Sequence, residues 1–164
     1  MAITIPAKAA GKYAVVETNH VSAVRTGNMA AQYSTDIEVL QNGMAVNVDH
    51  ETKKIVAPVA GEPLYLHASE EQIYEDHLGR DTFYIKAGQY PRALKLEIGD
   101  IFETDAVVAE DYTVGDILTP DEDGFWAANA APTAGSMVAQ VVGEIYLPNG
   151  KPGVKLAIVQ APTL

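Results

Sequence analysis

Short apolar runs separated by turn residues fill the sequence from residue 37 onward. The runs lie at residues 44–48, 54–57, 64–66, 83–85, 93–96, 125–127, 138–146 and 154–159. Between them stand pairs such as Asn42-Gly43, Asp123-Gly124 and Asn149-Gly150, whose residues tolerate the positive φ angles that tight turns need. Runs of this length and spacing predict a mainly β domain over residues 37–164, built as a small β-barrel, β-tulip or sandwich.

One helical insertion is predicted in this domain, at residues 69–79. Ser69-Glu-Glu-Gln72 has the spacing of a capping box, in which two side chains satisfy main-chain N–H groups at the start of a helix. A narrow apolar stripe follows at Ile73, Tyr74 and Leu78. Because Gly79 can adopt the left-handed conformation that ends many helices, we expect one short helix here.

Residues 1–36 differ from the rest of the chain in composition. They are rich in Ala, Thr, Ser, Asn and Gly, and only residues 13–16 form an apolar run that predicts a strand. This weak periodicity predicts an extended N-terminal arm, partly ordered in the free protein and ordered fully against a neighbour. An ordinary surface loop is the alternative interpretation.

One pattern of turn, strand, acidic turn and strand recurs along the sequence. At a constant offset of 72 positions it matches Gly43 with Gly115, Val46 with Leu118, and Asp49 with Asp121. A closer match joins Ile98-Gly-Asp-Ile101 to Val114-Gly-Asp-Ile117. These matches predict similar β-hairpins within one domain, and chance similarity in a β-rich chain is the alternative.

Charge and composition narrow the classes of function. The 164 residues carry a net charge of −11 and include no cysteine. A protein that binds nucleic acid needs a basic surface against the phosphates, so we expect no nucleic-acid partner. No basic segment precedes an apolar run at the N-terminus, and no apolar stretch is long enough to span a membrane. We therefore expect a soluble protein that stays where it is made, with no membrane partner.

The residues that carry most enzyme and metal chemistry are not grouped in this sequence. The four histidines, at positions 20, 50, 67 and 77, have no H-x-H or H-x-x-x-H spacing. The acidic run at 119–124 contains alternating carboxylates at Asp121 and Asp123 but no calcium-loop glutamate, so a hairpin turn explains it better. Motifs for phosphate loops and serine nucleophiles are missing. We expect no enzymatic activity, no catalytic residue, no cofactor and no bound metal.

The C-terminal third resembles a known family of structural proteins. Residues 113–128 have the pattern of a hairpin that begins at a Gly-Asp turn and contains an Asp-Gly turn, and strand patterns follow at 138–145 and 152–159. This order resembles the tailed-bacteriophage capsid decoration proteins, also called cement or head-stabilising proteins. The resemblance covers residues 97–160, and more faintly 40–67. It implies a small β-barrel or β-tulip on the outside of an icosahedral shell.

The resemblance also implies partners and a location. A decoration protein is made in the host cytoplasm, binds the major capsid protein on the surface of the virion, and often forms a dimer or trimer with itself. Such a protein stabilises the capsid by bridging its subunits. Another phage particle component, from the tail or baseplate, and a soluble β-rich binding module are the alternatives.

Five apolar and aromatic residues are candidates for an interface. These are Tyr13, Phe125, Trp126, Tyr146 and Leu147. The last four lie beside turns, where large apolar side chains are hard to justify on a free surface. For Trp126, the hydrophobic core and an interface are equally good interpretations.

Overall fold

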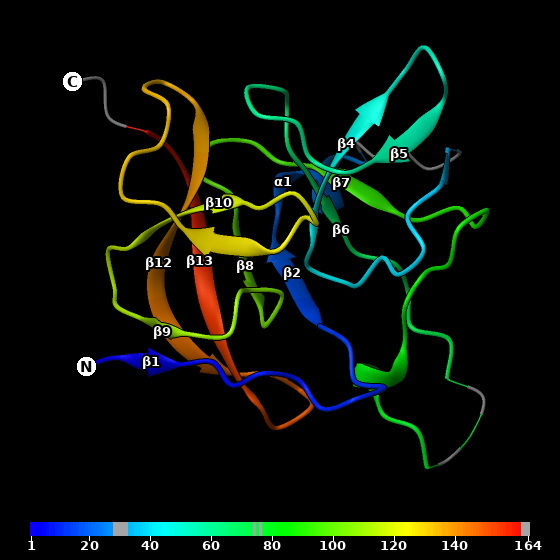
Figure 1. Cartoon of the computed structure of the whole chain (residues 1–164), viewed down its shortest axis with the longest axis horizontal. Coiled ribbons are helices and arrows are strands. Elements are labelled where there is room, and N and C mark those ends of the chain that lie inside the picture. Colours follow the sequence, from blue (N-terminus) through cyan, green and yellow to red (C-terminus); the bar gives the residue numbers. More distant parts are fainter. Residues whose placement is uncertain (28–32, 74, 76, 162–164) are drawn as a thin grey trace.

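The computed structural model describes residues 1–27, 33–73, 75 and 77–161 of the chain (Figure 1). It is mainly β, with 38% of the residues in strands and 5% in helices. The strands are β1 (Ile3–Thr4), β2 (Val16–His20), β3 (Ser34–Thr35), β4 (Ala45–Asp49), β5 (Lys54–Val56), β6 (Tyr65–His67), β7 (Ala93–Lys95), β8 (Ile101–Thr104), β9 (Asp111–Tyr112), β10 (Ile117–Pro120), β11 (Trp126–Ala128), β12 (Met137–Tyr146) and β13 (Pro152–Gln160). The helices are α1 (Ser22–Thr26) and the 3₁₀-helix η1 (Arg80–Thr82).

The strands form two large sheets and one small one. The order is β11-β10-β12-β13-β8-β2 in the six-stranded sheet and β3-β5-β4-β6-β7 in the five-stranded sheet, while β1 pairs with β9. All of these pairings are antiparallel except that of β3 with β5. The described strands do not close into a barrel, so the sandwich-like form of the predicted β fold is the one that fits.

The main hydrophobic core lies between the two large sheets. The six-stranded sheet contributes Phe102, Leu118 and Leu156, and the five-stranded sheet contributes Leu66 and Leu94, all of them buried. A second cluster lies on the other face of the five-stranded sheet and includes Leu40, Val46, Ile55 and Ala93. Because neighbouring residues of a strand point to opposite faces, the five-stranded sheet is buried on both sides.

The two matched Gly-Asp turns adopt one geometry. Gly99 and Gly115 have φ angles of 98° and 104°, which favour glycine over any other residue. The side chains of Asp100 and Asp116 each accept a hydrogen bond from the N–H three residues earlier, at 2.8 and 2.7 Å. The sequence match therefore corresponds to a repeated turn that begins β8 in one case and β10 in the other.

These turns give the centre of the six-stranded sheet an approximate internal twofold symmetry. The N–H of Gly115 donates to Val141 O of β12 at 2.8 Å, and the N–H of Gly99 donates to Ile158 O of β13 at the same distance. Ile117 of β10 pairs with Gln140, Gln140 pairs with Ala157, and Ala157 pairs with Ile101 of β8, so the two turns lie on opposite sides of the β12–β13 pair, near its middle. β8 and β10 thus flank the β12–β13 pair in equivalent ways (Figure 1).

The longer match, at an offset of 72, also corresponds to two hairpins. β4 pairs with β5, and β10 pairs with β11, each in antiparallel register. Asp49 accepts hydrogen bonds from the N–H groups of Glu51 and Thr52 in the first turn, at 2.9 and 3.2 Å. Asp121 accepts three main-chain N–H groups in the second turn, from residues 123, 124 and 125. Both acidic turns are therefore stabilised by their own first aspartate.

The prediction of a helix at residues 69–79 is wrong, because the described residues of that segment contain no helix. Tyr74 and Asp76 lie outside the described residues. The Ser69 hydroxyl, the expected cap, instead accepts the Arg92 N–H at 2.9 Å, and the Ser69 N–H donates to the Asn42 side chain. A single helix of ten residues is marginal without packing, so these tertiary bonds prevail. The helix α1 lies elsewhere and ends at Gly27, whose φ is 74°.

The described residues of 1–36 join the sheets and do not form a separate arm. β1 pairs with β9, β2 lies at the edge of the six-stranded sheet against β8, and β3 pairs with β5. Ile3, Ile5, Val15 and Val21 are buried. Short strands of two to five residues leave too little alternation for the sequence pattern to reveal them. Residues 28–32 of the predicted arm lie outside the described part.

Candidate functional site

The five candidate interface residues divide between the core and the surface. Trp126 has no exposed surface, and Leu147 is only 3% exposed, so both belong to the core of the folded chain. Phe125 is half-buried against the second hydrophobic cluster. Tyr13 is half-buried as well, with its ring centroid 4.4 Å from that of Tyr84. Tyr146 alone among the five is largely exposed, at 72%.

Trp126 joins the two large sheets. Its Nε1–H donates to Gly43 O at 3.0 Å, and its ring centroid lies 5.6 Å from that of Phe102. The interface interpretation of Trp126 would need the core to open. The structure therefore assigns Trp126 a packing role and leaves Tyr146 as the most exposed of the five candidate residues.

The outer edge of β12 is open beyond Val141. β13 pairs with β12 from Met137 to Tyr146, with a register shift between Val141 and Gly143 that leaves Val142 without a partner in the ladder. β10 pairs only with residues 139 and 140, and Asp116 O accepts the N–H of Val141. No described strand pairs with this edge after that point. We call residues 142–146 the open β12 edge. It carries the exposed side chains of Val142 (39%), Glu144 and Tyr146.

The direction of each main-chain N–H and C=O group along the open β12 edge follows from the hydrogen-bond pattern of the antiparallel β12–β13 pair. The N–H of Leu147 donates to Lys151 O at 2.9 Å, which makes this the hydrogen-bonded pair that closes the β12–β13 hairpin. Hydrogen-bonded and non-hydrogen-bonded pairs alternate in antiparallel sheets. The N–H and C=O of Ile145 therefore face β13, whereas those of Glu144 and Tyr146 face outward. The partner of Tyr146 in the register is Pro152, which has no N–H to offer.

Two further apolar side chains are exposed at the Gly-Asp turns. Ile98 and Val114 occupy the same position of the two turns and are 61% and 65% exposed. Val114 lies next to the open β12 edge, because the adjacent Gly115 donates to Val141 O. Ile98 lies on the other side of the β12–β13 pair, because the adjacent Gly99 donates to Ile158 O. The sequence match located both positions, although it did not show that their side chains face solvent.

The net charge of the protein is confined to one part of the chain. Residues 96–150 contain no lysine or arginine, while the rest of the chain has equal numbers of acidic and basic residues. The eleven acidic residues of this part are Glu97, Asp100, Glu103, Asp105, Glu110, Asp111, Asp116, Asp121, Glu122, Asp123 and Glu144. The whole charge of −11 thus lies on β8 to β12 and their turns. This uneven distribution of charge is visible in the sequence, but the net charge of the whole chain does not show it.

Several of these carboxylates act on one tyrosine and lack a cation. Burial raises the pKa of Tyr112, and the charges of Glu110, Asp116 and Asp121 raise it further, so all three carboxylates lie within electrostatic range of the Tyr112 hydroxyl. In the described part of the chain, no ion pair involves Glu110, Asp116, Asp121 or Glu144. The region around β9, β10 and β12 therefore presents an uncompensated negative potential.

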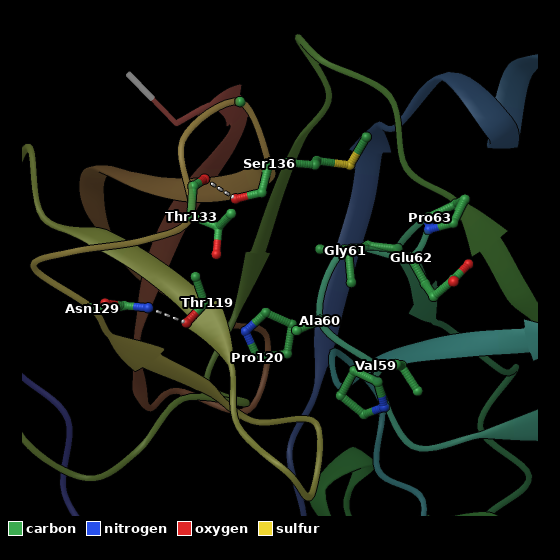
Figure 2. A pocket seen from close by; sticks show the side chains of 14 residues that line it. Val59, Ala60, Gly61, Glu62, Pro63, Thr119, Pro120, Asn129, Thr133 and Ser136 are labelled. Carbon is green, nitrogen blue, oxygen red and sulfur yellow. Dashed lines mark hydrogen bonds between the residues drawn. The ribbon is translucent and has the colours of Figure 1, made fainter. Parts of the chain in front are cut away.

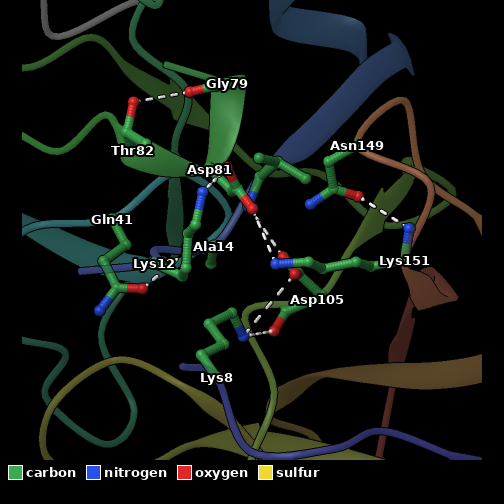
Figure 3. Close-up of polar contacts among 11 residues, drawn as sticks. Lys8, Lys12, Ala14, Gln41, Gly79, Asp81, Thr82, Asp105, Asn149 and Lys151 are labelled. Carbon is green, nitrogen blue, oxygen red and sulfur yellow. Dashed lines mark hydrogen bonds and ion pairs between the residues drawn. The ribbon is translucent and has the colours of Figure 1, made fainter. Parts of the chain in front are cut away.

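A cluster of paired charges holds the N-terminal segment against the fold (Figure 3). Lys8 Nζ donates to the main-chain oxygen of Asp105 and lies 3.8 Å from its carboxylate. Lys12 and Lys151 both donate to Asp81, at 3.1 and 2.7 Å. Each charge has an opposite charge beside it. The cluster thus links residues 8–12 to η1 and to the β12–β13 hairpin.

The pKa values in this cluster follow from burial and pairing. Burial lowers the pKa of Lys8 and raises that of Asp105, although each partner favours the charged form of the other. Burial opposes the charge of Asp81 as well, but hydrogen bonds from Lys151 and Lys12 lower its pKa overall. The three lysines are already engaged by two carboxylates, which is the arrangement of a structural network.

An open pocket of about 390 Å³ lies between residues 58–64 and the strands β10 and β12 (Figure 2). Its walls are mostly apolar and include Val59, Pro63, Pro120 and Met137. Its polar groups are paired with each other. Asn129 donates to the Thr119 hydroxyl at 3.1 Å, and the Ser136 hydroxyl donates to Thr133 O at 2.6 Å. No titratable group other than Glu62 lines this pocket among the described residues.

His67 is the buried histidine of the structure. Its Nδ1 donates to Gln41 O and its Nε2 makes a hydrogen bond with the Ser69 hydroxyl, both at 2.8 Å. Burial lowers the pKa of His67 to about 4. The described residues contain no group of three His, Asp or Glu side chains arranged to hold a metal ion. His67 therefore stabilises the turn at Gly43 from the inside of the fold.

The protein is expected to lose stability as the pH falls below about 6.5. The unfolded chain binds a proton at histidine with a pKa of 6.5, and folded His67 does not bind one until about 4. The free energy of unfolding should therefore drop by about 2 kcal/mol between pH 8 and pH 5. Urea unfolding at each pH measures this change.

The matched variants for this experiment are His67→Gln and His77→Gln. The first should be less stable at pH 8 but should lack the slope between pH 6.5 and 5. The second removes a ring whose side chain is 76% exposed and should keep the slope. An unchanged free energy of unfolding in the original chain down to pH 5 would show that His67 accepts a proton in the folded state.

Comparison with known proteins gave no match. No family model, no curated protein and no solved structure matches this chain. Among the described residues, no helix is long and apolar enough to cross a membrane. The surface formed by the open β12 edge, Val114 and the surrounding carboxylates is therefore the candidate functional site on geometric grounds alone.

Proposed function

We propose that this protein is a non-enzymatic structural component of a tailed-phage virion. In this role it binds the outside of the assembled capsid and stabilises it by bridging neighbouring subunits of the major capsid protein. The observation that carries the proposal is the open β12 edge, where exposed Val142 and Tyr146 border a strand edge with unpaired main-chain groups. Such a surface is suited to contact with another protein.

The turns on which the family resemblance rests also support this function. Gly99-Asp100 and Gly115-Asp116 are real turns of one geometry, and they begin strands that flank β12 and β13. Binding that occurs only to the assembled shell would stabilise the shell by mass action, in proportion to RT ln(1 + [L]/Kd). Many copies acting together would strengthen a capsid without any chemical step.

The first test is whether the protein distinguishes assembled shells from free capsid subunits. Purified protein is mixed with each, and the bound fraction is measured after sedimentation. We expect binding to shells at a saturating ratio that matches the number of equivalent surface sites, and none to free subunits. A few copies per particle would instead indicate a tail or baseplate component.

Tyr146→Ala is expected to weaken binding to shells by about tenfold. An exposed tyrosine that becomes buried at an interface commonly contributes between 1 and 2 kcal/mol, roughly. Because Tyr146 contacts solvent in the free chain, the free energy of unfolding should change by less than about 0.5 kcal/mol. Sedimentation with shells measures the first effect and urea unfolding the second.

Tyr90→Ala is the matched control for this variant. Tyr90 is 67% exposed but lies outside β12 and its neighbours. The Tyr90→Ala variant should therefore bind shells with the same affinity as the original chain. Equal losses of binding in both variants would argue that exposed aromatic residues act without regard to position, and the open β12 edge would lose its assigned role.

A further inference from the structure

The open β12 edge has the features of a site for an added β-strand. Glu144 and Tyr146 direct their N–H and C=O groups away from β13, and no described segment satisfies them. The register of β12 shifts between Val141 and Gly143 and is unbroken from Gly143 to Tyr146. The edge strand β2 is less suited, because its register shifts inside the strand, between Glu17 and His20, and Glu17 is already bound to Arg80 at 2.7 Å. Extended peptides bind such edges by main-chain hydrogen bonds.

The charge around the edge indicates which kind of strand fits. Glu144 lies on the edge itself, and Asp116 adjoins its start through the hydrogen bond from Val141. Neither has a cation beside it in the part of the chain that the structure describes. An incoming segment with lysine or arginine side chains would supply the missing positive charge, and its approach would be accelerated by the negative potential.

A second copy of the chain fits this edge poorly. Antiparallel pairing centred on Glu144 would place two Glu144 carboxylates opposite each other, and like charges directly opposite are destabilising. Each copy would also bring the full charge of −11. The charge therefore favours a different, basic partner over self-association at this place.

We propose that the open β12 edge binds an extended, lysine- or arginine-bearing segment of another protein by β-strand addition. The segment would pair with the main chain of Glu144 and Tyr146. Because these two side chains lie on the same face of β12, basic side chains of the segment on that face would place their charges near Glu144 and their aliphatic stems against the Tyr146 ring. This inference deepens the proposed function. It rests on that function only for the identity of the partner, because the segment would then belong to a protein of the capsid shell.

The test uses the full-length protein and a synthetic probe. The probe is a capped eight-residue peptide of alternating lysine and valine, and its control has the same charge with proline in place of each valine. Proline cannot donate to a ladder, so the control retains the electrostatic attraction alone. We expect the probe to shift the backbone amide resonances of Glu144 and Tyr146 and to protect both from hydrogen exchange, and the control to do neither.

Two pairs of variants separate the main chain from the side chains. Tyr146→Pro removes an N–H that faces away from β13, which an edge strand tolerates, and Tyr146→Ala keeps that N–H. Because one hydrogen bond contributes about 1 kcal/mol, Tyr146→Pro should bind the probe about fivefold more weakly than Tyr146→Ala. Glu144→Lys should reduce both affinity and its dependence on salt, whereas Glu51→Lys, an exposed site outside residues 96–150, should not.

Three results would overturn the proposal. Equal binding of the probe and its proline control would indicate attraction by charge alone. The same conclusion would follow if the amide resonances of the acidic turns shifted while those of Glu144 and Tyr146 did not. Protection of the same two amides in concentrated protein without peptide, together with a dimer in sedimentation, would assign the edge to a second copy. If the protein bound the probe as expected but did not bind shells, the proposed function would be refuted, and the strand-addition site would remain in place.

Discussion

Trp126→Ala should destabilise the fold by about 3–5 kcal/mol, because it removes the largest fully buried side chain of the core. The variant loses the contact with Phe102 and leaves Gly43 O, which now accepts the indole N–H at 3.0 Å, without its donor. Urea unfolding followed by far-ultraviolet circular dichroism measures the loss.

The control for this variant is Trp126→Phe. It keeps an aromatic ring in the core and removes the hydrogen bond to Gly43, so its loss should be smaller than that of Trp126→Ala. If Trp126→Ala kept its stability within about 0.5 kcal/mol and lost binding to shells instead, Trp126 would belong to an interface. The packing role assigned to it would then be incorrect.

Gly43→Ala is expected to be similarly disruptive, with a loss of about 3–5 kcal/mol from backbone strain and overpacking together. A Cβ at Gly43 would lie 2.1 Å from Thr104 Oγ1, and φ is 90°. Thr104 cannot easily move, because its hydroxyl donates to Val15 O at 2.7 Å inside the fold. The midpoint of thermal or urea unfolding reports this loss.

Gly115→Ala is the matched control at the equivalent position of the repeat. Its φ is 104°, but a Cβ there would have no neighbour within 4 Å. This variant should lose only the cost of the left-handed conformation, roughly 1–2 kcal/mol. Equal losses in the two variants would mean that strain alone limits both turns, and that the close approach of Gly43 to β8 has no energetic consequence.

The sequence predicted the elements that depend on local chemistry. The Gly-Asp turns before β8 and β10 and the aspartate-stabilised hairpins at Asp49 and Asp121 need only a few adjacent residues, and the structure confirms them. The mainly β class followed from the same turns. Local signals therefore sufficed for turns in which an aspartate accepts hydrogen bonds from residues two to four positions away.

Elements that depend on distant partners were predicted less well. Ser69 has the spacing of a helix cap, but its hydrogen bonds go to Asn42 and Arg92. Strands β1 and β2 are identified by pairing with β9 and β8, about a hundred positions away, and not by their own pattern. Long-range pairing of this kind leaves no local trace in the sequence.

The candidate site was also predicted only in part. Tyr146 was identified because it precedes a turn, and Trp126 was identified for the same reason although it lies in the core. The open β12 edge could not be predicted, because it arises from β10 being shorter than β12. The absence of basic residues from 96–150 was readable in the sequence and would have directed attention to the same region.

The central claim is that the protein stabilises a capsid by binding its outer surface, and the loss of packaged DNA on heating tests it most directly. Release of DNA is followed by dye fluorescence in complete particles, in particles that lack this protein, and in the latter after purified protein is added back. We predict release at a lower temperature from particles without the protein, full restoration by the original chain, and incomplete restoration by Tyr146→Ala. Release at one and the same temperature from all of these particles would contradict the claim.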